Sequence, residues 1–549
     1  MSPASGTLKL HQALARYLVE SGTDVMFGLI GDGNLFMVDS YTREFGGTYL
    51  SVAHEANSVL AAIGYARVSG RVGVATVTHG PAFTNTMTAL VEGVRSRTPI
   101  VLIAGDTARE DRRNLQNIEQ REVARSTGAG FVELRSERTW LEDVRAAFRQ
   151  ATIERRPVVL NVPIDFIWRD VAWGGPYPSA VVETEAVPSA SALNEAVGAL
   201  ASARRPIVLA GRGASSAAAR RQLVRLAERI GAPLATTIGG KDLFAGEPFD
   251  LGVFGTLSTD ATVSAIIASD CIIAFGASLN HFTTAEESYL VGKTVIVCDR
   301  DPGRTQSSSP NLVVVTGDAA LTAEAIVEWL DEGEIEPTGF RDRMQLSSAA
   351  ATVASSRAAP SAPADIALPI RRVYDMLDER LPDDCVIVTD GGRFMPLAWQ
   401  GLHVKHPRHL VTTVSFGAIG NGMGHALGAA MAEPDLPVVL VTGDGGFMLG
   451  GLTEFNSAVR HGLNLTVVIL NDGGYGAEYV QFEARNMDPD LSLLGWADFA
   501  PVGIALGGSG RTVATLDELG AVLDGLSLSG LPTIVDIKLD PRSIPNAMH

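Results

Sequence analysis

The sequence predicts an α/β protein with three parallel-sheet domains. Short apolar runs that fit buried strands alternate with stretches of helical periodicity along almost the whole chain. Two stretches break this alternation: residues 173–188, which begin Trp-Gly-Gly-Pro-Tyr-Pro, and residues 347–365, which are rich in Ala, Ser and Pro. A chain of 549 residues is also too long for one hydrophobic core. We therefore expect domains at residues 1–175, 188–335 and 366–549.

The apolar runs place individual elements in the first two of these blocks. The expected elements are a helix at residues 7–22 and strands at residues 25–28, 72–77, 99–104, 206–211, 271–276 and 295–299. Gly211-Arg212-Gly213 follows one of these strands, but it lacks the third glycine of a dinucleotide-binding turn. It is therefore only a weak dinucleotide signal.

The composition is that of a well-buried globular enzyme, because 46% of the residues are hydrophobic and 19% are charged. A net charge of −18 argues against nucleic acid or an anionic membrane as partner. The sequence also has no apolar run of membrane length and no N-terminal secretion signal. The cysteines at 271, 298 and 385 lack metal-ligand spacing and fit free core thiols of a reducing compartment. We expect a cytoplasmic protein.

The most informative stretch lies in the third block, from Val438 to Glu478. It reads as a strand, a glycine-rich turn, a helix and a second strand that ends in Asn471-Asp472-Gly473-Gly474. A right-handed βαβ crossover makes the two strands parallel, so their carboxyl ends share one edge of the sheet. This geometry is expected to place Asp444 and Asp472 side by side.

Two carboxylates at neighbouring strand ends suit a divalent cation, and magnesium is the obvious candidate. The glycines leave backbone N–H groups free to point at a diphosphate near the following helix. The sequence contains no Gly-x-x-x-x-Gly-Lys-Ser/Thr motif, which disfavours a nucleoside-triphosphate P-loop. The turn is therefore a candidate site for a metal-bound diphosphate.

The pairing of Gly443-Asp444-Gly445 with Asn471-Asp472 resembles the signature of thiamine diphosphate enzymes. In that family an Asp, a later Asn and a backbone carbonyl bind Mg²⁺. The resemblance implies Asp444, Asp472 and the carbonyl of Gly474 as metal ligands. However, Asp472 stands where the family usually has a second Asn. The choice between Asn471 and Asp472 as the second side-chain ligand therefore stays open. The remaining cofactor contacts that it implies are Gly443, Gly445, Gly446 and Tyr475.

With three blocks in this order, nearly the whole chain is similar to the pyruvate decarboxylase and acetolactate synthase superfamily. The resemblance implies a thiamine diphosphate-binding fold with pyrimidine-binding, middle and diphosphate-binding domains. It also implies that Glu55, at the start of a small-residue helix, is the carboxyl that hydrogen-bonds the aminopyrimidine N1′, where burial would keep its proton affinity near neutral pH. A plainer explanation is that a negative charge complements the helix dipole there.

Four further residues are candidates for the reaction centre or the cofactor. Asp32 looks like the turn Asp of 2-oxo-acid decarboxylases, and His79 replaces a Ser in a loop next to the reaction centre. Gln116 occupies the region where acetolactate synthases and benzaldehyde lyase place a glutamine, and Glu478 aligns with a glutamate of the decarboxylases. Their ordinary readings are a turn Asp, a structural His, an exposed loop Gln and a helix cap.

Ile419 precedes Gly420 where the family has a bulky aliphatic residue that wedges between the two rings of the cofactor; its ordinary reading is a core residue. Some relatives bind FAD in the middle block, which is possible here but not favoured. The pyrimidine and diphosphate ends of the cofactor are met by neighbouring subunits in this family, so the resemblance implies a homodimer or homotetramer with sites at the interface. Small-residue helix faces around residues 61–62 and 424–432 fit close packing between subunits, or within one core.

The expected function is that of a thiamine diphosphate- and Mg²⁺-dependent 2-oxo-acid decarboxylase and carboligase, similar to acetolactate synthase. Pyruvate is the expected donor, and a second carbonyl compound the acceptor. The alternatives are a non-ligating decarboxylase that releases an aldehyde and a C–C hydrolase or lyase of a diketone. A non-catalytic cofactor-binding subunit is disfavoured, because the chain keeps Glu55 beside both metal-site acids.

Overall fold

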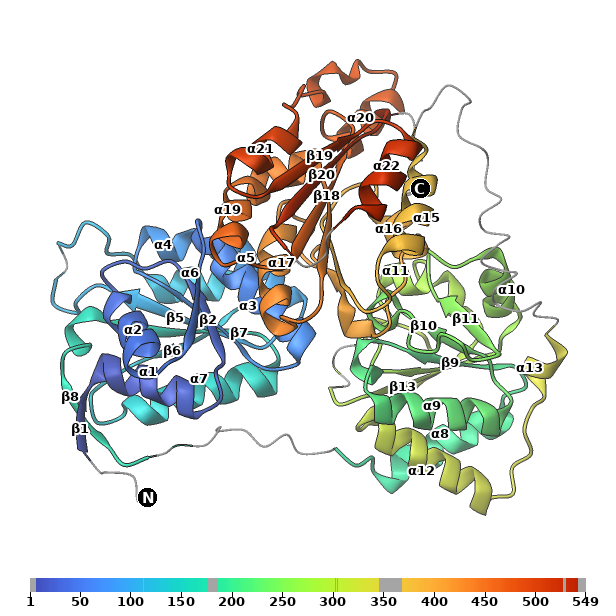
Figure 1. Ribbon diagram of the computed structural model, residues 1–549. Coiled ribbons are helices and arrows are strands. Elements are labelled where there is room, and N and C mark those ends of the chain that lie inside the picture. Colours follow the sequence, from blue (N-terminus) through green and yellow to red (C-terminus); the bar gives the residue numbers. More distant parts are fainter. Residues whose placement is uncertain are drawn as a thin grey trace. The chain divides into compact units, whose positions relative to one another are not determined.

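The computed structural model describes residues 6–111, 113–175, 177, 186–301, 303, 305–344, 368–526 and 530–541. The predicted linker at residues 347–365 and most of the one at 173–188 lie outside these residues. The described chain contains three six-stranded sheets with helices between the strands (Figure 1). The strand pairs that carry the cores of these sheets are parallel. The predicted α/β fold with three parallel sheets is therefore confirmed.

The first sheet has the strand order β3-β2-β4-β5-β7-β6. Its strands are β2 (Val25–Gly28), β3 (Thr48–Ser51), β4 (Gly73–Val77), β5 (Ile100–Asp106), β6 (Gly130–Glu133) and β7 (Pro157–Pro163). Its helices are α1 (Leu10–Glu20), α2 (Leu35–Asp39), α3 (Glu55–Ser69), α4 (Pro81–Thr84), α5 (Met87–Arg95), α6 (Gln120–Ser126) and α7 (Trp140–Glu154). The expected strands at 25–28, 72–77 and 99–104 correspond to β2, β4 and β5.

The helix expected at residues 7–22 begins later than predicted. Residues Gly6–Lys9 form strand β1, which pairs antiparallel with β8 (Asp170–Trp173), and α1 starts only at Leu10. The Lys9 N–H then donates to Gln12 Oε1 at 3.0 Å, which marks the helix start. The partner strand is far away in the sequence, so local periodicity could not reveal the pairing.

The third block forms a sheet of strand order β16-β15-β17-β18-β20-β19. Its strands are β15 (Val386–Thr389), β16 (Leu410–Thr412), β17 (Val438–Gly443), β18 (Leu465–Asn471), β19 (Ser509–Val513) and β20 (Thr533–Lys538). Its longer helices are α15 (Ile370–Arg380), α16 (Met395–Gly401), α17 (Gly422–Ala432), α19 (Leu452–Arg460), α20 (Gly476–Glu483), α21 (Phe499–Ala505) and α22 (Leu516–Asp524). The first and third sheets thus share one connectivity. β17 and β18 are parallel neighbours, which confirms the predicted βαβ unit.

The middle sheet has the order β11-β10-β9-β12-β13-β14, the doubly wound order of dinucleotide-binding folds. Its strands are β9 (Pro206–Ala210), β10 (Leu234–Thr236), β11 (Asp250–Val253), β12 (Cys271–Phe275), β13 (Thr294–Asp299) and β14 (Leu312–Thr316). One apolar core lies against α8 (Ala190–Ser202), α9 (Ala217–Ile230) and α12 (Ala319–Glu332), and a second includes α10 (Asp260–Ala268) (Figure 1). The three strands predicted in this block are confirmed.

By its contacts the chain divides into two compact units. One unit contains residues 1–182, 365–402 and 411–549, and the other contains residues 183–364 and 403–410. The first and third sheets therefore belong to the same unit. The domain boundaries expected from the sequence stay a prediction.

Helices α3 and α17 hold the first and third blocks together by backbone packing. A Cβ atom on Gly428 would lie 1.9 Å from the carbonyl oxygen of Ala61, and one on Gly64 would lie 2.2 Å from that of His425. Only glycine permits so close an approach of two helices. The sequence left open whether these small-residue helix faces pack between subunits or within one core. They meet each other within one chain.

Gly428→Ala is therefore expected to lower the free energy of unfolding by about 2–3 kcal/mol, because the added methyl group forces the two helices apart. The matched control is Gly520→Ala in α22, where a Cβ atom would meet nothing closer than 3.4 Å. That control should be neutral or about 0.5–1 kcal/mol more stable, since alanine favours a helix. Urea unfolding of both variants measures the difference, and equal stabilities would contradict the packing described.

Two buried carboxylates also bridge the first and third blocks. Glu454 of α19 accepts the backbone N–H groups of Ala53 and His54, both at 2.9 Å. Glu92 of α5 accepts the N–H of Phe416 at 2.7 Å, and it also accepts that of the preceding residue at 3.1 Å. Both glutamates have 0% exposure. These bonds fix the chain just before Glu55 in one block and just before the loop of residues 417–420 in the other.

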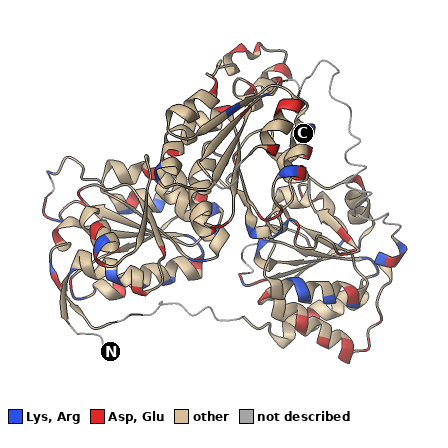
Figure 2. Cartoon of the chain, in the orientation of Figure 1, with Lys and Arg blue, Asp and Glu red and all other residues tan. Residues whose placement is uncertain are grey.

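Charged side chains lie mainly on helices and loops, and the strands carry few of them (Figure 2). The three cysteines are buried and free of disulfides, as predicted. Among the helices of the described chain, none combines the length and the hydropathy of a membrane span.

Candidate functional site

Four candidate residues follow the carboxyl ends of adjacent strands in the first sheet. Glu55 follows β3, Asp32 follows β2, His79 follows β4 and Gln116 follows β5. Because these strands are parallel, the four residues lie at one edge of the sheet, where α/β folds bind ligands.

Glu55 is the first residue of α3. Its Oε2 accepts a hydrogen bond of 2.9 Å from Asn85 Nδ2. His54 caps the helix, since its Nδ1 accepts the N–H of Ala56 at 3.2 Å. The Glu55 carboxyl is only half-buried. The burial expected for this residue is therefore not provided by a single chain.

The turn that carries Asp32 lies against the loop of His79. Asn34 fixes this turn, because its Oδ1 accepts the N–H of Gly31 at 2.8 Å. A Cβ atom on Gly33 would lie 2.9 Å from His79 Nδ1, so the two loops touch. Asp32 itself is exposed, whereas His79 is buried.

The backbone of Gln116 packs against Gly80, directly after His79. A Cβ atom on Gly80 would lie 2.3 Å from the carbonyl oxygen of Gln116, and its φ of +60° also favours glycine. The side chain of Gln116 is half-buried. The fold thus gathers the loops of Asp32, His79 and Gln116 at one place.

Gln120 joins the same loops, although no motif in the sequence predicts this role. Its Oε1 accepts the N–H of Gly80 at 3.0 Å, and its Nε2 donates to Asn161 Oδ1 at 2.7 Å. Asn161 in turn donates to Asp106 Oδ2 at 2.7 Å, and burial raises the pKa of Asp106. A single glutamine at the start of a helix does not predict such a network, because its partners lie far away in the sequence.

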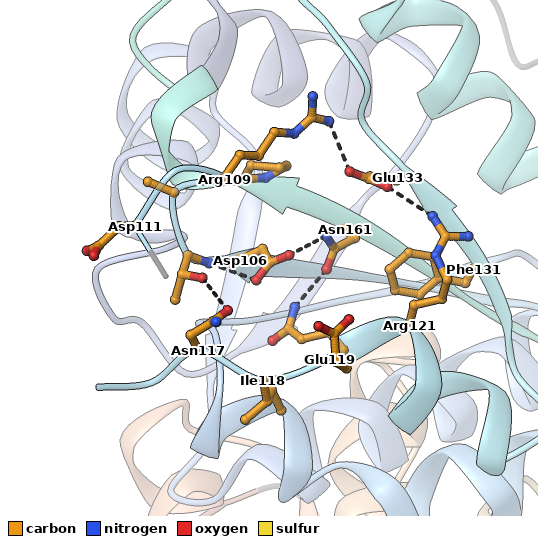
Figure 3. A pocket seen from close by; sticks show the side chains of 14 residues that line it. Asp106, Arg109, Asp111, Asn117, Ile118, Glu119, Arg121, Phe131, Glu133 and Asn161 are labelled. Atoms are coloured by element: carbon orange, nitrogen blue, oxygen red, sulfur yellow. Dashed lines mark hydrogen bonds and ion pairs between the residues drawn. The ribbon is translucent and has the colours of Figure 1, made fainter. Parts of the chain in front are cut away.

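A pocket of about 220 Å³ lies beside this network (Figure 3). Its two arginines both pair with Glu133, at 3.0 Å from Arg109 and 2.9 Å from Arg121. Its lining comprises Asp106, Thr107, Ala108, Arg109, Asp111, Asn117, Ile118, Glu119, Gln120, Arg121, Phe131, Glu133, Asn161 and Pro163. The four candidate residues of the first sheet are outside this lining.

The acids of the third block lie at the carboxyl ends of β17 and β18. Asp444 is 2% exposed and accepts N–H groups from Gly445 at 2.7 Å and Gly473 at 2.8 Å. Burial, and after it the charge of Asp472, raises the pKa of Asp444 to about 7. The two carboxylates are thus close enough to repel each other.

Asn471, the other side chain left open as a metal ligand, is engaged elsewhere. Its Nδ2 donates to Asp536 Oδ1 at 3.0 Å, and its Oδ1 accepts the N–H of Gly473 at 3.3 Å. Gly474 forms an isolated antiparallel bridge with Leu493 and has no room for a side chain. The ring of Tyr475 covers Gly445, where a Cβ atom would lie 2.6 Å from Cε1.

Asp390, a second residue whose role no sequence motif predicts, organises the loop of Ile419. It is 1% exposed, and its Oδ2 accepts the N–H of Gly420 at 3.0 Å and the hydroxyl of Thr442 at 3.2 Å. These bonds hold Gly420, and with it the half-buried Ile419, near the Gly443–Gly446 turn, since a Cβ atom on Gly446 would lie 3.5 Å from the nitrogen of Gly420. Glu478 lies exposed on α20.

The residues present fit a divalent cation with a bound diphosphate. The cation would relieve the repulsion between Asp444 and Asp472, and the glycines beside them leave the backbone accessible. Within the described residues, no group of three or more His, Cys, Asp or Glu side chains is arranged for a metal. The remaining ligands would therefore come from a backbone carbonyl, the diphosphate or water.

Three family models match the chain in the order of its three sheets. The model described as the N-terminal TPP binding domain of thiamine pyrophosphate enzymes matches residues 8–127. The central domain of these enzymes matches residues 193–326, and their C-terminal TPP binding domain matches residues 390–537.

Similar proteins align with the chain over nearly its full length. One is named "Probable 2-ketoarginine decarboxylase AruI", from Pseudomonas aeruginosa; it is 29% identical and covers 97% of this chain and 94% of its own. The acetolactate synthase large subunit of Haemophilus influenzae is 25% identical, covering 96% and 94%. The sulfoacetaldehyde acetyltransferase of Alcaligenes xylosoxydans xylosoxydans is 25% identical, covering 93% and 89%.

The matches span both sheets that carry the candidate residues, and they follow the block order predicted from the sequence. The chain therefore belongs to the thiamine pyrophosphate enzyme family, whose members form or cleave carbon–carbon bonds with this cofactor.

Proposed function

We propose that this enzyme is a Mg²⁺-dependent 2-oxo-acid decarboxylase and carboligase similar to acetolactate synthase, with pyruvate as its donor. The observation that carries this proposal is the pair of acidic half-sites, Glu55 at one sheet edge and Asp444 with Asp472 at another. When bound, thiamine diphosphate supplies an electron sink for breaking the bond beside a carbonyl. The names of the acetolactate synthase and acetyltransferase relatives support transfer to an acceptor.

In this proposal the chain's own residues divide the work. Asp444, Asp472 and the carbonyl of Gly474 hold Mg²⁺, and the glycine turn at 443–446 receives the diphosphate. Glu55 exchanges a proton with the aminopyrimidine of the cofactor. The cofactor contacts also include Ile419 and Tyr475. Asn471 supports the turn rather than the metal, because its Oδ1 accepts the N–H of Gly473 and its Nδ2 donates to Asp536.

We also propose that the two half-sites combine across the interface of a homodimer or homotetramer. Large apolar side chains near both half-sites are exposed in the single chain: Ile30 is 57% exposed, Leu115 98%, Phe416 38% and Leu449 66%. They lie close in sequence to Asp32, Gln116, Ile419 and Asp444 respectively. Exposed apolar groups around an incomplete site are typical of a surface that a partner covers.

The proposal requires no flavin. At the switch point of the middle sheet, the N–H of Gly211 donates to the carbonyl of Phe275 at 2.8 Å, and that of Gly213 donates to Gly276 at 3.0 Å. These two N–H groups, which a dinucleotide phosphate would use, are therefore engaged by the end of β12 and the glycine that follows it.

A non-ligating decarboxylase is the second candidate. It is favoured by the contact between the loops of Asp32 and His79, which brings two groups able to handle protons to one place. The 2-ketoarginine decarboxylase relative also supports it. Incubation with pyruvate or 2-ketoarginine, thiamine diphosphate and Mg²⁺, with CO₂, aldehydes and acetolactate quantified, separates the candidates. CO₂ with acetolactate supports the first, CO₂ with aldehyde the second, and no turnover of either donor contradicts both.

Product partition is expected to depend on Gln116 and Glu478. A nearby acid favours protonation and release of an aldehyde, whereas a site that positions a second carbonyl favours ligation. Gln116→Ala should lower the ratio of ligated product to aldehyde by roughly tenfold, and Glu478→Gln should raise it by a similar factor. Unchanged ratios at equal CO₂ release, measured by chromatography of the products, would remove both residues from the reaction centre.

A further inference from the structure

Arg393 forms a buried ion pair with the proposed metal ligand Asp472. It lies in the loop after β15, and its Nη2 donates to Asp472 Oδ2 at 2.9 Å. The two side chains are 8% and 7% exposed. The pair therefore joins the loop after β15 to the end of β18 in a largely desolvated place.

The surroundings hold this pair in one arrangement. Nη2 of Arg393 also donates to the carbonyl oxygen of Pro541, beyond β20. A Cβ atom on Gly476 would lie 2.6 Å from both Arg393 Nε and Asp472 Oδ2, so the pair depends on a glycine there. The ring of Tyr479 lies 6.0 Å from the guanidinium carbon. The guanidinium is thus fixed by three chain segments.

The pair also determines which charge the site presents. Asp444 and Asp472 lie close together at a place that is proposed to receive an anionic diphosphate. Two uncompensated carboxylates would attract the cation but repel the diphosphate. Arg393 offsets one of the two negative charges, and it does so through Oδ2 alone. Among the described residues, no other side chain donates to Asp472.

We infer that Arg393 is a positioning residue of the metal half-site, which fixes Asp472 through Oδ2 and offsets its charge. The inference rests on the proposed Mg²⁺ site. It predicts that substitutions at 393 and 472 have coupled effects on the affinity for the cofactor. An uncharged residue at 472 should bind the cofactor better when residue 393 is also uncharged.

The test is a double-mutant cycle on the full-length chain with Arg393→Gln, Asp472→Asn and the combined variant. Titration calorimetry with thiamine diphosphate in excess Mg²⁺ gives the affinities, and thermal unfolding of the cofactor-free proteins reports folding. Each single variant should bind at least about tenfold more weakly than the wild type, because each leaves a buried charge unpaired. Arg380→Gln is the matched control, since it breaks an exposed pair with Asp524 in the same block.

The combined variant should bind thiamine diphosphate at least about tenfold more tightly than expected from adding the two single changes in binding free energy. The reason is that it restores the net charge of the site. Losses that simply add in the combined variant would show that Arg393 acts only through Pro541 and would overturn the inference. Wild-type affinity in Arg393→Gln would overturn it as well. A wild-type chain whose binding ignores Mg²⁺ would instead remove the metal site itself, and this inference with it.

Discussion

Replacing Asp444 with alanine is expected to abolish Mg²⁺-dependent binding of thiamine diphosphate. Asp444 is the more buried of the two acids, and its carboxylate also holds the N–H groups of Gly445 and Gly473. Partners outside the metal ligands already change metal affinity about 10- to 100-fold, so loss of a ligand should weaken binding by more than about 100-fold. The diphosphate should dissociate with the cation, since its charge is held mainly through the metal.

Calorimetric titration of thiamine diphosphate, with Mg²⁺ and with chelator, measures this effect. The matched control is Asp435→Ala, which removes an exposed acid shortly before β17 in the same block and should bind like the wild type. Affinity near that of the wild type in Asp444→Ala, still dependent on Mg²⁺, would show that the cofactor is anchored elsewhere.

Glu55→Gln is expected to leave cofactor binding intact and to slow turnover by about 100- to 10,000-fold. Glutamine keeps the size of the side chain and can still accept the hydrogen bond from Asn85, but an amide cannot exchange the proton. The loss should therefore appear in kcat and in hydrogen–deuterium exchange at C2 of the bound cofactor, and not in its dissociation constant. Exchange at the wild-type rate would take Glu55 out of the mechanism.

Glu122→Gln is the matched control for this variant. Glu122 is exposed on α6 in the same block, and its neutralisation changes the net charge of the chain equally. It should leave both exchange and turnover unchanged. A similar slowing in both variants would indicate that charge, rather than proton transfer by Glu55, controls the rate.

The strands could be predicted because each parallel strand is buried on both faces and reads as an apolar run. The run at residues 25–28 became β2, and the two runs of the βαβ unit became β17 and β18, which pair in parallel. The parallel pairing follows from the handedness of the crossover. The closeness of Asp444 and Asp472 follows from the same rule, because each residue comes directly after one of the two strands.

What the sequence could not reveal depends on partners far away along the chain. Asp390 and Gln120 matter through bonds to Gly420, Gly80 and Asn161, which no local pattern records. The start of α1 was misplaced for the same reason, because β1 pairs with a strand at residues 170–173.

The two small-residue helix faces show the same limit in another way. Their composition predicted close packing but not the partner, and within this chain Gly428 meets α3 at Ala61. The half-burial of Glu55 could not be foreseen either, because it follows from which surfaces one chain leaves uncovered. In the proposed oligomer, a second chain would complete the environment that the resemblance implied for this carboxyl.

The proposed oligomer combines the Glu55 half-site of one chain with the Asp444 half-site of another in one catalytic site. Co-expression of Glu55→Gln and Asp444→Ala chains with different tags, followed by purification through both tags, tests it directly. Each parent variant should be almost inactive. A hybrid dimer carries one site with both changes and one with neither, so the doubly purified hybrid should show about half of the wild-type turnover. Inactive hybrids of verified composition would contradict the claim and place the whole site within a single chain.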